Sequence, residues 1–276
     1  MTILPTTPHL AFGSIGSSHS SMLLLAACVG LISGVTSGLC GVSLGGALVV
    51  LANLLLGTGQ HVAQGLSLIA QIPPTSLTGV KRYQTEGHGI SRGWLPWLAS
   101  GFLVGAAAGA ICAAHVSNPI LQWSYVGYLG VLEALLILRS TPRRLPTDAV
   151  TRLGSIPRSA LLMVGLLAGL SSGYLGIGGG LAIVVGLTSG LKIPQHQAQH
   201  LSLVLSIIPI TTPAAYVYWR EGLLPSWPIL AAVIVGLWGG ITLGARAANH
   251  VRPAALRRAL MALVAAMAAC MAWKAL

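Results

Sequence analysis

Eight apolar segments dominate this chain, and they restrict what it can fold into more than any other feature. The segments lie at about 22–56, 62–80, 94–114, 119–138, 160–191, 197–217, 229–247 and 254–273. A helix of about 20 apolar residues crosses the roughly 30 Å core of a bilayer, and six of the segments fit one crossing each. Only 7% of the residues are charged, whereas a soluble domain has about 25%. The sequence therefore predicts an all-α integral membrane protein.

The first segment of each group of four is too long for one crossing and contains a Gly- and Ser-rich break. The breaks are SGLCGVSLGG (Ser37–Gly46) and SGYLGIGGGL (Ser172–Leu181). Flanking stretches of about 14 residues give only about 21 Å of helix. We therefore expect either a helical hairpin that enters and leaves by one face, or two tilted crossings with a broken middle. Irregular backbone at membrane depth requires surrounding protein or water.

The two halves of the chain are related by an internal repeat. Adding 135 to a position in the first half gives its counterpart in the second, without a gap: QHVAQGLSL (Gln60–Leu68) falls on QHQAQHLSL (Gln195–Leu203). We expect an N-terminal tail (1–21), a first repeat (22–138), a basic linker (139–159) and a second repeat (160–276). Each repeat is predicted to hold one Gly-broken hairpin or helix pair followed by three transmembrane helices.

Charge indicates that the two repeats have opposite orientations in the membrane. The loop after the third stretch holds Lys81, Arg82 and Arg92, whereas its counterpart holds Arg220 balanced by Glu221. The loop at His115 has no Lys or Arg, whereas its counterpart carries Arg246, Arg252, Arg257 and Arg258. Since cytoplasmic loops are enriched in Lys and Arg, this predicts inverted-topology repeats. The Arg-rich linker is then cytoplasmic, and both termini lie on the far side.

In inverted repeats with broken helices, the substrate site lies near the membrane midplane, where the breaks meet. Helix ends there present unpaired N–H groups that bind anions, and glycine lets a ligand approach the backbone. The helix after each break adds polar side chains on one face. We predict as substrate-binding residues Ser37, Gly38, Gly41, Ser43, Ser172, Gly173, Gly176, Gly178, Gly179, Gly180, Gln64, Ser67, Gln199 and Ser202. Two alternatives stay open. The small residues of the breaks could serve only to pack helices together, and the polar residues could serve only to form hydrogen bonds between helices.

Other features give weaker indications. Glu133 is the only carboxylate inside an apolar span and is a candidate for proton coupling. Pro73-Pro74 and Pro209 are expected to kink the helices that contain them. The four Cys have no metal-ligand spacing, and the G-x-S-x-G run Gly41–Gly45 lacks the context of a hydrolase. We therefore predict no catalytic residue, no metal, no cofactor and no enzyme. The net charge of +11 lies in short loops without a nucleic-acid motif, so no nucleic-acid partner is expected.

Several of these motifs together resemble the sulfite exporter TauE/SafE family. They are GLSSGYLGIGGG (Gly169–Gly180), its weaker copy at Gly34–Gly46, and the helix with Ala63, Leu66-Ser67-Leu68 and Pro74-Thr75-Ser76-Leu77. The resemblance implies an export permease for small sulfur-containing anions such as sulfite or organosulfonates. The first half departs from the pattern, because Ser43-Leu44 stands where the second half has Gly178-Gly179.

We therefore predict a multi-pass protein of the bacterial inner membrane that exports a small anion by alternating access. A channel-like anion pore and a transporter of another small solute are the alternatives. The expected partners are a small anionic solute and membrane lipid. The sequence leaves open the substrate, the coupling ion and the oligomeric state. A homo-oligomer is one of the open states.

Overall fold

The computed structural model describes residues 19–40, 45–73, 92–138, 156–193, 195–248 and 253–275. Within these ranges every regular element is helical. The elements are α1 (His19–Cys40), α2 (Gly45–Leu55), α3 (Gln60–Ala70), the 3-10 turn η1 (Arg92–Trp94), α5 (Leu95–Ala114), α6 (Asn118–Leu138), α7 (Arg158–Leu175), α8 (Gly180–Ser189), α9 (Gln195–Leu205), α10 (Thr212–Arg220), α11 (Trp227–Ala248) and α12 (Pro253–Ala275).

The long helices confirm the prediction of an all-α integral membrane protein. Four helices, α1, α5, α7 and α11, are long and apolar enough to cross a bilayer. Their outer faces expose large apolar side chains, such as Val104 at 63% and Val235 at 71%. Such side chains are stable facing lipid and unfavourable facing water.

Two helix pairs, α1 with α11 and α5 with α7, pack so closely that their glycines touch backbone. A Cβ on Gly34 of α1 would lie 2.3 Å from the carbonyl oxygen of Leu237, and one on Gly240 of α11 would lie 2.2 Å from that of Leu31. In the other pair, a Cβ on Gly105 would lie 2.1 Å from the carbonyl oxygen of Leu166. Each pair joins the first helix of one half to a later helix of the other half, through the small-residue contacts common between membrane helices.

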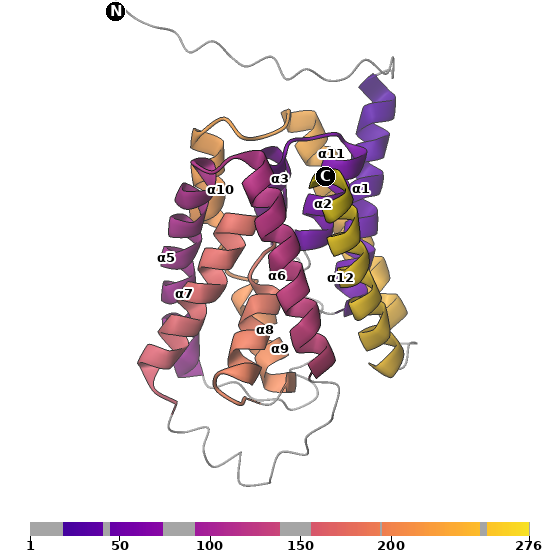
Figure 1. Cartoon of the computed structure of the whole chain (residues 1–276). Helices are drawn as coiled ribbons and strands as arrows, with labels where there is room; N and C mark the ends of the chain where they lie inside the picture. The colour runs from indigo at the N-terminus through magenta and orange to yellow at the C-terminus, as the bar shows by residue number, and fades with distance from the viewer. Residues whose placement is uncertain are drawn as a thin grey trace, which may run out of the picture.

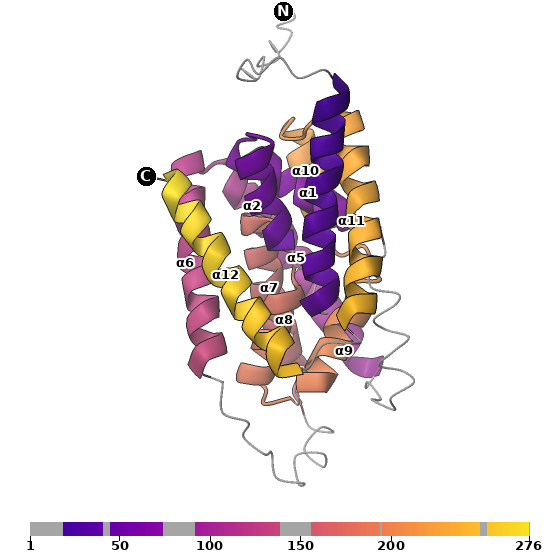
Figure 2. The same cartoon turned by 90° about the vertical axis from the view of Figure 1, so that its right-hand side faces the viewer.

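Two short hairpins occupy opposite ends of the bundle (Figures 1 and 2). The helices α2 and α3 lie toward the end at which α12 finishes, and α8 and α9 lie toward the end at which α7 begins. With 11 and 10 residues, α2 and α8 are only about 15–17 Å long, about half of the bilayer core. Both hairpins therefore reach only to the middle of the molecule.

Helices related by 135 positions begin in matching register. The starts of α2, α3 and α6, at Gly45, Gln60 and Asn118, correspond to those of α8, α9 and α12 at Gly180, Gln195 and Pro253. Figure 1 shows α1 and α6 running from the end where α12 finishes toward the end where α7 begins, whereas α7 and α12 run the other way.

The breaks are shorter than the sequence suggested. The prediction of two short stretches of about 14 residues around the first break was wrong, because α1 has 22 residues and α2 only 11. The helix α1 continues to Cys40 and α7 to Leu175, so Ser37, Gly38, Ser172 and Gly173 are helical. The glycines near the ends of α1 and α7 pack against neighbouring helices, and this packing outweighs their low helix propensity.

The segment predicted as one crossing at 197–217 is also different. It forms two short helices, α9 and α10, on either side of Pro209. Proline supplies no N–H and its ring clashes with the preceding turn, so the helix ends here instead of bending. The equivalent α3 ends at Ala70, and Pro74 lies outside the described residues.

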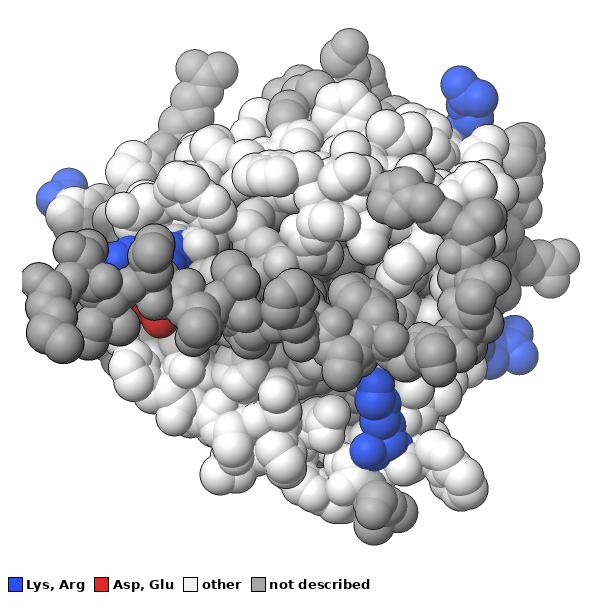
Figure 3. Space-filling model, turned by 90° about the horizontal axis from the view of Figure 1, so that it is seen from above, with Lys and Arg blue, Asp and Glu red and all other residues white. Residues whose placement is uncertain are grey.

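Charge is sparse on the end of the molecule at which α12 finishes. Where this face is described, it is mostly uncharged, and Lys and Arg side chains lie toward its rim (Figure 3). This is what the positive-inside rule leads us to expect for a non-cytoplasmic face. The direction of insertion and the boundaries of the two repeats stay predictions.

Candidate functional site

The second break, Gly176–Gly179, is a turn that only glycine adopts readily. Gly176 ends α7 with φ +68° and donates its N–H to the carbonyl oxygen of Ser172 at 2.8 Å. Gly178 has φ +78°. Side chains other than glycine rarely adopt these left-handed conformations, so both residues are required by the backbone itself.

Ser67, on α3, contacts the main chain of both halves. Its hydroxyl lies 3.0 Å from the carbonyl oxygen of Gly45, where α2 begins, and 2.8 Å from that of Gly176. The second half repeats the first of these bonds, because the hydroxyl of Ser202 donates to the carbonyl oxygen of Gly180 at 3.1 Å. We call the region around Ser67, Gly45 and Gly176–Gly180 the junction.

The junction is closely packed. Gln71, on the same face of α3, donates from Nε2 to the carbonyl oxygen of Ser67 at 2.9 Å. A Cβ on Gly178 would lie 1.9 Å from Oε1 of Gln71, and a Cβ on Gly179 would lie 1.9 Å from Cε2 of Phe102. Side chains from α3 and α5 therefore occupy the space that the glycines leave.

Two buried hydrogen-bond donors near the junction have no partner among the described residues. They are Nε2 of Gln64 and the hydroxyl of Ser172, in side chains that are 0% and 1% exposed. The hydroxyl of Tyr218, on α10, donates to Oε1 of Gln64 at 2.8 Å and lies 3.3 Å from the carbonyl oxygen of Gly173. An unsatisfied buried donor costs about 1–3 kcal/mol, so this pair marks a candidate ligand position.

Tyr218 was not among the predicted site residues. Its signal in the sequence was the repeat, in which Tyr83 falls on Tyr218. The spacing of residues in a single helix could not have revealed it, because Tyr218 lies 154 residues from Gln64 in the chain.

The remaining predicted residues are distributed differently. Gly38 and Gly173 lie in helix contacts, where a Cβ would approach the carbonyl oxygens of Ile241 and Ala106 to 2.4 and 2.0 Å. Ser37 on α1 and Gln199 on α9 are half-buried and interact with other residues. Gly41 and Ser43 lie outside the described residues. A role of these residues in substrate binding stays a prediction.

The helix starts at the junction favour negative charge. The helix α8 begins at Gly180, and no side chain caps it, while α2 begins at Gly45. The first N–H groups of a helix lack partners within it, and the peptide dipoles make this end positive. Two such ends give the junction a positive character that does not depend on a Lys or Arg side chain.

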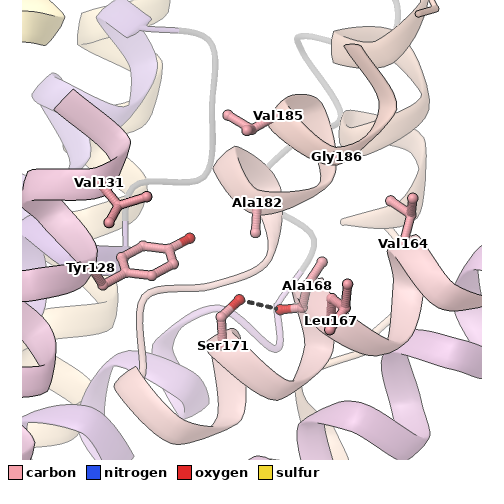
Figure 4. Close-up of a pocket in the computed structure, with 9 residues that line it drawn as sticks. All are labelled: Tyr128, Val131, Val164, Leu167, Ala168, Ser171, Ala182, Val185 and Gly186. Atoms are coloured by element: carbon pink, nitrogen blue, oxygen red, sulfur yellow. Dashed lines mark hydrogen bonds between the residues drawn. The ribbon is translucent and has the colours of Figure 1, made fainter. Parts of the chain in front are cut away.

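A cavity of about 250 Å³ lies between α6, α7 and α8 (Figure 4). Its wall is mostly apolar, and Tyr128 and Ser171 supply its hydroxyl groups. Val131 and Leu167, also in its wall, are each 61% exposed on the outer surface. This cavity therefore opens toward lipid and is unsuited to an anion.

Glu133, on α6, is half-buried, and its Oε2 has no hydrogen-bond partner among the described residues. Its proposed role in proton coupling stays a prediction.

Comparison with known proteins identifies the class of this chain. The family described as sulfite exporter TauE/SafE matches residues 17–271. A relative in Bacillus subtilis (strain 168), described as "Probable membrane transporter protein YdhB", is 27% identical over 239 residues, which cover 86% of this chain and 95% of that protein. No solved structure matches the chain. Both descriptions are of membrane transporters. The chain therefore belongs to the sulfite exporter TauE/SafE family and is a multi-pass membrane transporter.

Proposed function

We propose that this transporter exports a small oxyanion, of the sulfite or organosulfonate type, by alternating access around the junction. The observation that carries the proposal is the double contact of Ser67 with Gly45 and Gly176, because it brings the breaks of both halves to one point. The family and its relative support transport in general, and the chemistry of the junction supports an anion.

The anion follows from the kinds of polar group present. Gln64 Nε2 and the Ser172 hydroxyl are donors without partners among the described residues, and two helix N-termini lie in the same region. An oxyanion accepts hydrogen bonds from all of these groups, and such charge-assisted bonds are about twice as strong as neutral ones. A metal cation would meet donors in place of the oxygen ligands that it needs.

Alternating access is supported by the two short hairpins. They enter from opposite ends of the bundle and meet at the junction, as expected for inverted repeats. In this conformation Gln71 and Phe102 fill the space beside Gly178 and Gly179, which supports a closed state. A carrier needs such a closed state, from which either hairpin moves aside to open one end.

The test is flux through the purified protein in liposomes at a set membrane potential. We expect sulfite to leave the side held negative faster than protein-free liposomes allow, since 100 mV contributes about 2.3 kcal/mol per charge. Flux of neutral solutes or cations, without anion flux, would contradict the proposal. Counterflow separates the alternatives: substrate on the opposite side accelerates exchange in a carrier but not in a channel-like pore.

A further inference from the structure

The polar face of α3 continues one helical turn beyond the junction, to Gln60. Gln60 and Gln64 are four residues apart, so they share a face and lie about 6 Å apart along the axis. Both side chains are 0% exposed, and Nε2 of each lacks a hydrogen-bond partner among the described residues. Two unsatisfied amide donors therefore lead from the junction toward the end of the molecule at which α3 begins.

Gln60 is held by a second buried amide, Asn53 on α2. Nδ2 of Asn53 donates to Oε1 of Gln60 at 2.9 Å, and Oδ1 of Asn53 has no partner within the described part of the chain. If the oxygen and nitrogen positions of both amides were exchanged, one donor and one acceptor would again be left without a partner. Because nearly all buried polar groups in proteins are paired, two touching amides with one donor and one acceptor left over indicate a ligand.

A cation contacts the backbone of Asn53. The ammonium group of Lys274, near the end of α12, donates a hydrogen bond to the backbone carbonyl oxygen of Asn53. The Lys274 side chain is exposed, so water and solutes reach it, and an ammonium group has three N–H donors. The charge pattern of the sequence predicts that this end of the molecule lies outside the cytoplasm.

The buried amide of Asn53 is not repeated in the second half. The counterpart of Asn53 in the second half is Thr188, whose hydroxyl donates to the carbonyl oxygen of Val184 in its own helix at 2.7 Å. The two halves are thus alike at the junction but differ here, and this asymmetry suits a step that occurs on one side only.

We propose that Gln60, Asn53 and Lys274 form a release site, a second binding position for the transported oxyanion on its outward path. The proposal rests on the proposed function. Oxygen atoms of the anion accept from Gln60 Nε2 and from the Lys274 ammonium group, and an anion with one O–H group donates to Asn53 Oδ1. The site therefore favours a singly protonated oxyanion, such as hydrogen sulfite, over sulfate, which has no O–H group near neutral pH.

The experiment is calorimetric titration of the purified full-length protein with sulfite in slightly acidic buffer. We expect two binding events for the wild type. Lys274→Met should weaken one event at least about tenfold, the effect of losing one charge-assisted hydrogen bond, and leave the other intact. Gln60→Glu keeps an oxygen for Asn53 Nδ2 but adds a negative charge, so it should abolish the same event. Sulfate should bind at this site more weakly than sulfite.

The matched control is Lys192→Met, which removes an exposed cation from the turn between α8 and α9. It should leave both binding events unchanged, and unchanged thermal unfolding would show that each variant is folded. A wild type with one binding event, lost in Gln64→Leu and retained in Lys274→Met, would refute the release site but not the proposed function. A wild type that neither binds nor transports sulfite would refute both. A bound water alone between Asn53 and Gln60, at saturating sulfite, would also overturn the release site.

Discussion

The hydroxyl oxygen of Ser67 lies 2.8 Å from the carbonyl oxygen of Gly176, although 109 residues separate them in the chain. Through this contact, a helix of the first half contacts the break of the second. Any movement that opens the junction must therefore break or rearrange this bond.

Replacing Ser67 with Ala removes the hydroxyl and leaves the carbonyl oxygens of Gly45 and Gly176 without this donor. We expect a loss of about 0.5–2 kcal/mol in unfolding free energy, in the range of hydrogen bonds between membrane helices, and a lower initial rate of transport. Thermal unfolding in detergent and flux in liposomes measure the two effects. Ser67→Thr keeps the hydroxyl and should retain more of both, and equal losses in the two variants would contradict this role.

Tyr218→Phe should raise the half-saturation concentration of the transported anion, because Gln64 then loses the hydroxyl that holds its Oε1. The ring stays in place, so the loss of unfolding free energy should not exceed about 1–3 kcal/mol, the cost of leaving a buried acceptor without its donor. Tyr216→Phe on the same helix is the control, because Tyr216 is 54% exposed. If both variants transport with wild-type kinetics, the orientation of Gln64 has no part in binding.

Gly179→Val should abolish transport while leaving membrane insertion intact. A Cβ at Gly179 would overlap the ring of Phe102, so the side chain of valine must displace either the ring or the start of α8. The milder variant Gly179→Ala should be partly inactive, and Gly179→Ala combined with Phe102→Leu should recover activity because leucine vacates space. Wild-type flux in Gly179→Val would remove this break from the transport path.

Gly240→Val should destabilise the protein by about 1–3 kcal/mol, the usual cost of overpacking, and by more than an overlap with a side chain would, because the Cβ meets backbone. The carbonyl oxygen of Leu31 would lie 2.2 Å away and cannot rotate aside. Gly239→Val, one residue earlier, places its Cβ in open space among the described residues and should be nearly neutral. Equal unfolding temperatures for the two variants would show that α1 and α11 do not depend on this contact.

The sequence predicted the helical class, the repeat and the polar face of α3, because each depends on local composition or on a fixed spacing. Ser67 and Ser202 were singled out in this way, and both bond to the starts of the short helices, while their role in substrate binding stays a prediction. The length of the breaks was not predicted, because it depends on which glycines face a neighbouring helix. Gly38 and Gly173 look the same in the sequence as Gly176 and Gly178, yet the first two pack helices and the last two form a turn.

Contacts between distant segments could not be predicted either. The partners of Gln64 and Gly179 are Tyr218 and Phe102, and no local pattern links these residues. The choice of α11 as the partner of α1 likewise follows from tertiary packing, although glycines at spacings of four marked both surfaces.

The pairing of α1 with α11 and of α5 with α7 has a consequence for biogenesis. A nascent chain emerges from the ribosome in order, so α1 enters the bilayer long before Trp227 has been translated. Until then, the glycine surface of α1 must be shielded by lipid or by the insertion machinery. In a nascent chain arrested before α11, the glycine surface of α1 would therefore lack its final partner. The pairing of α1 with α11 would form only during the last quarter of translation.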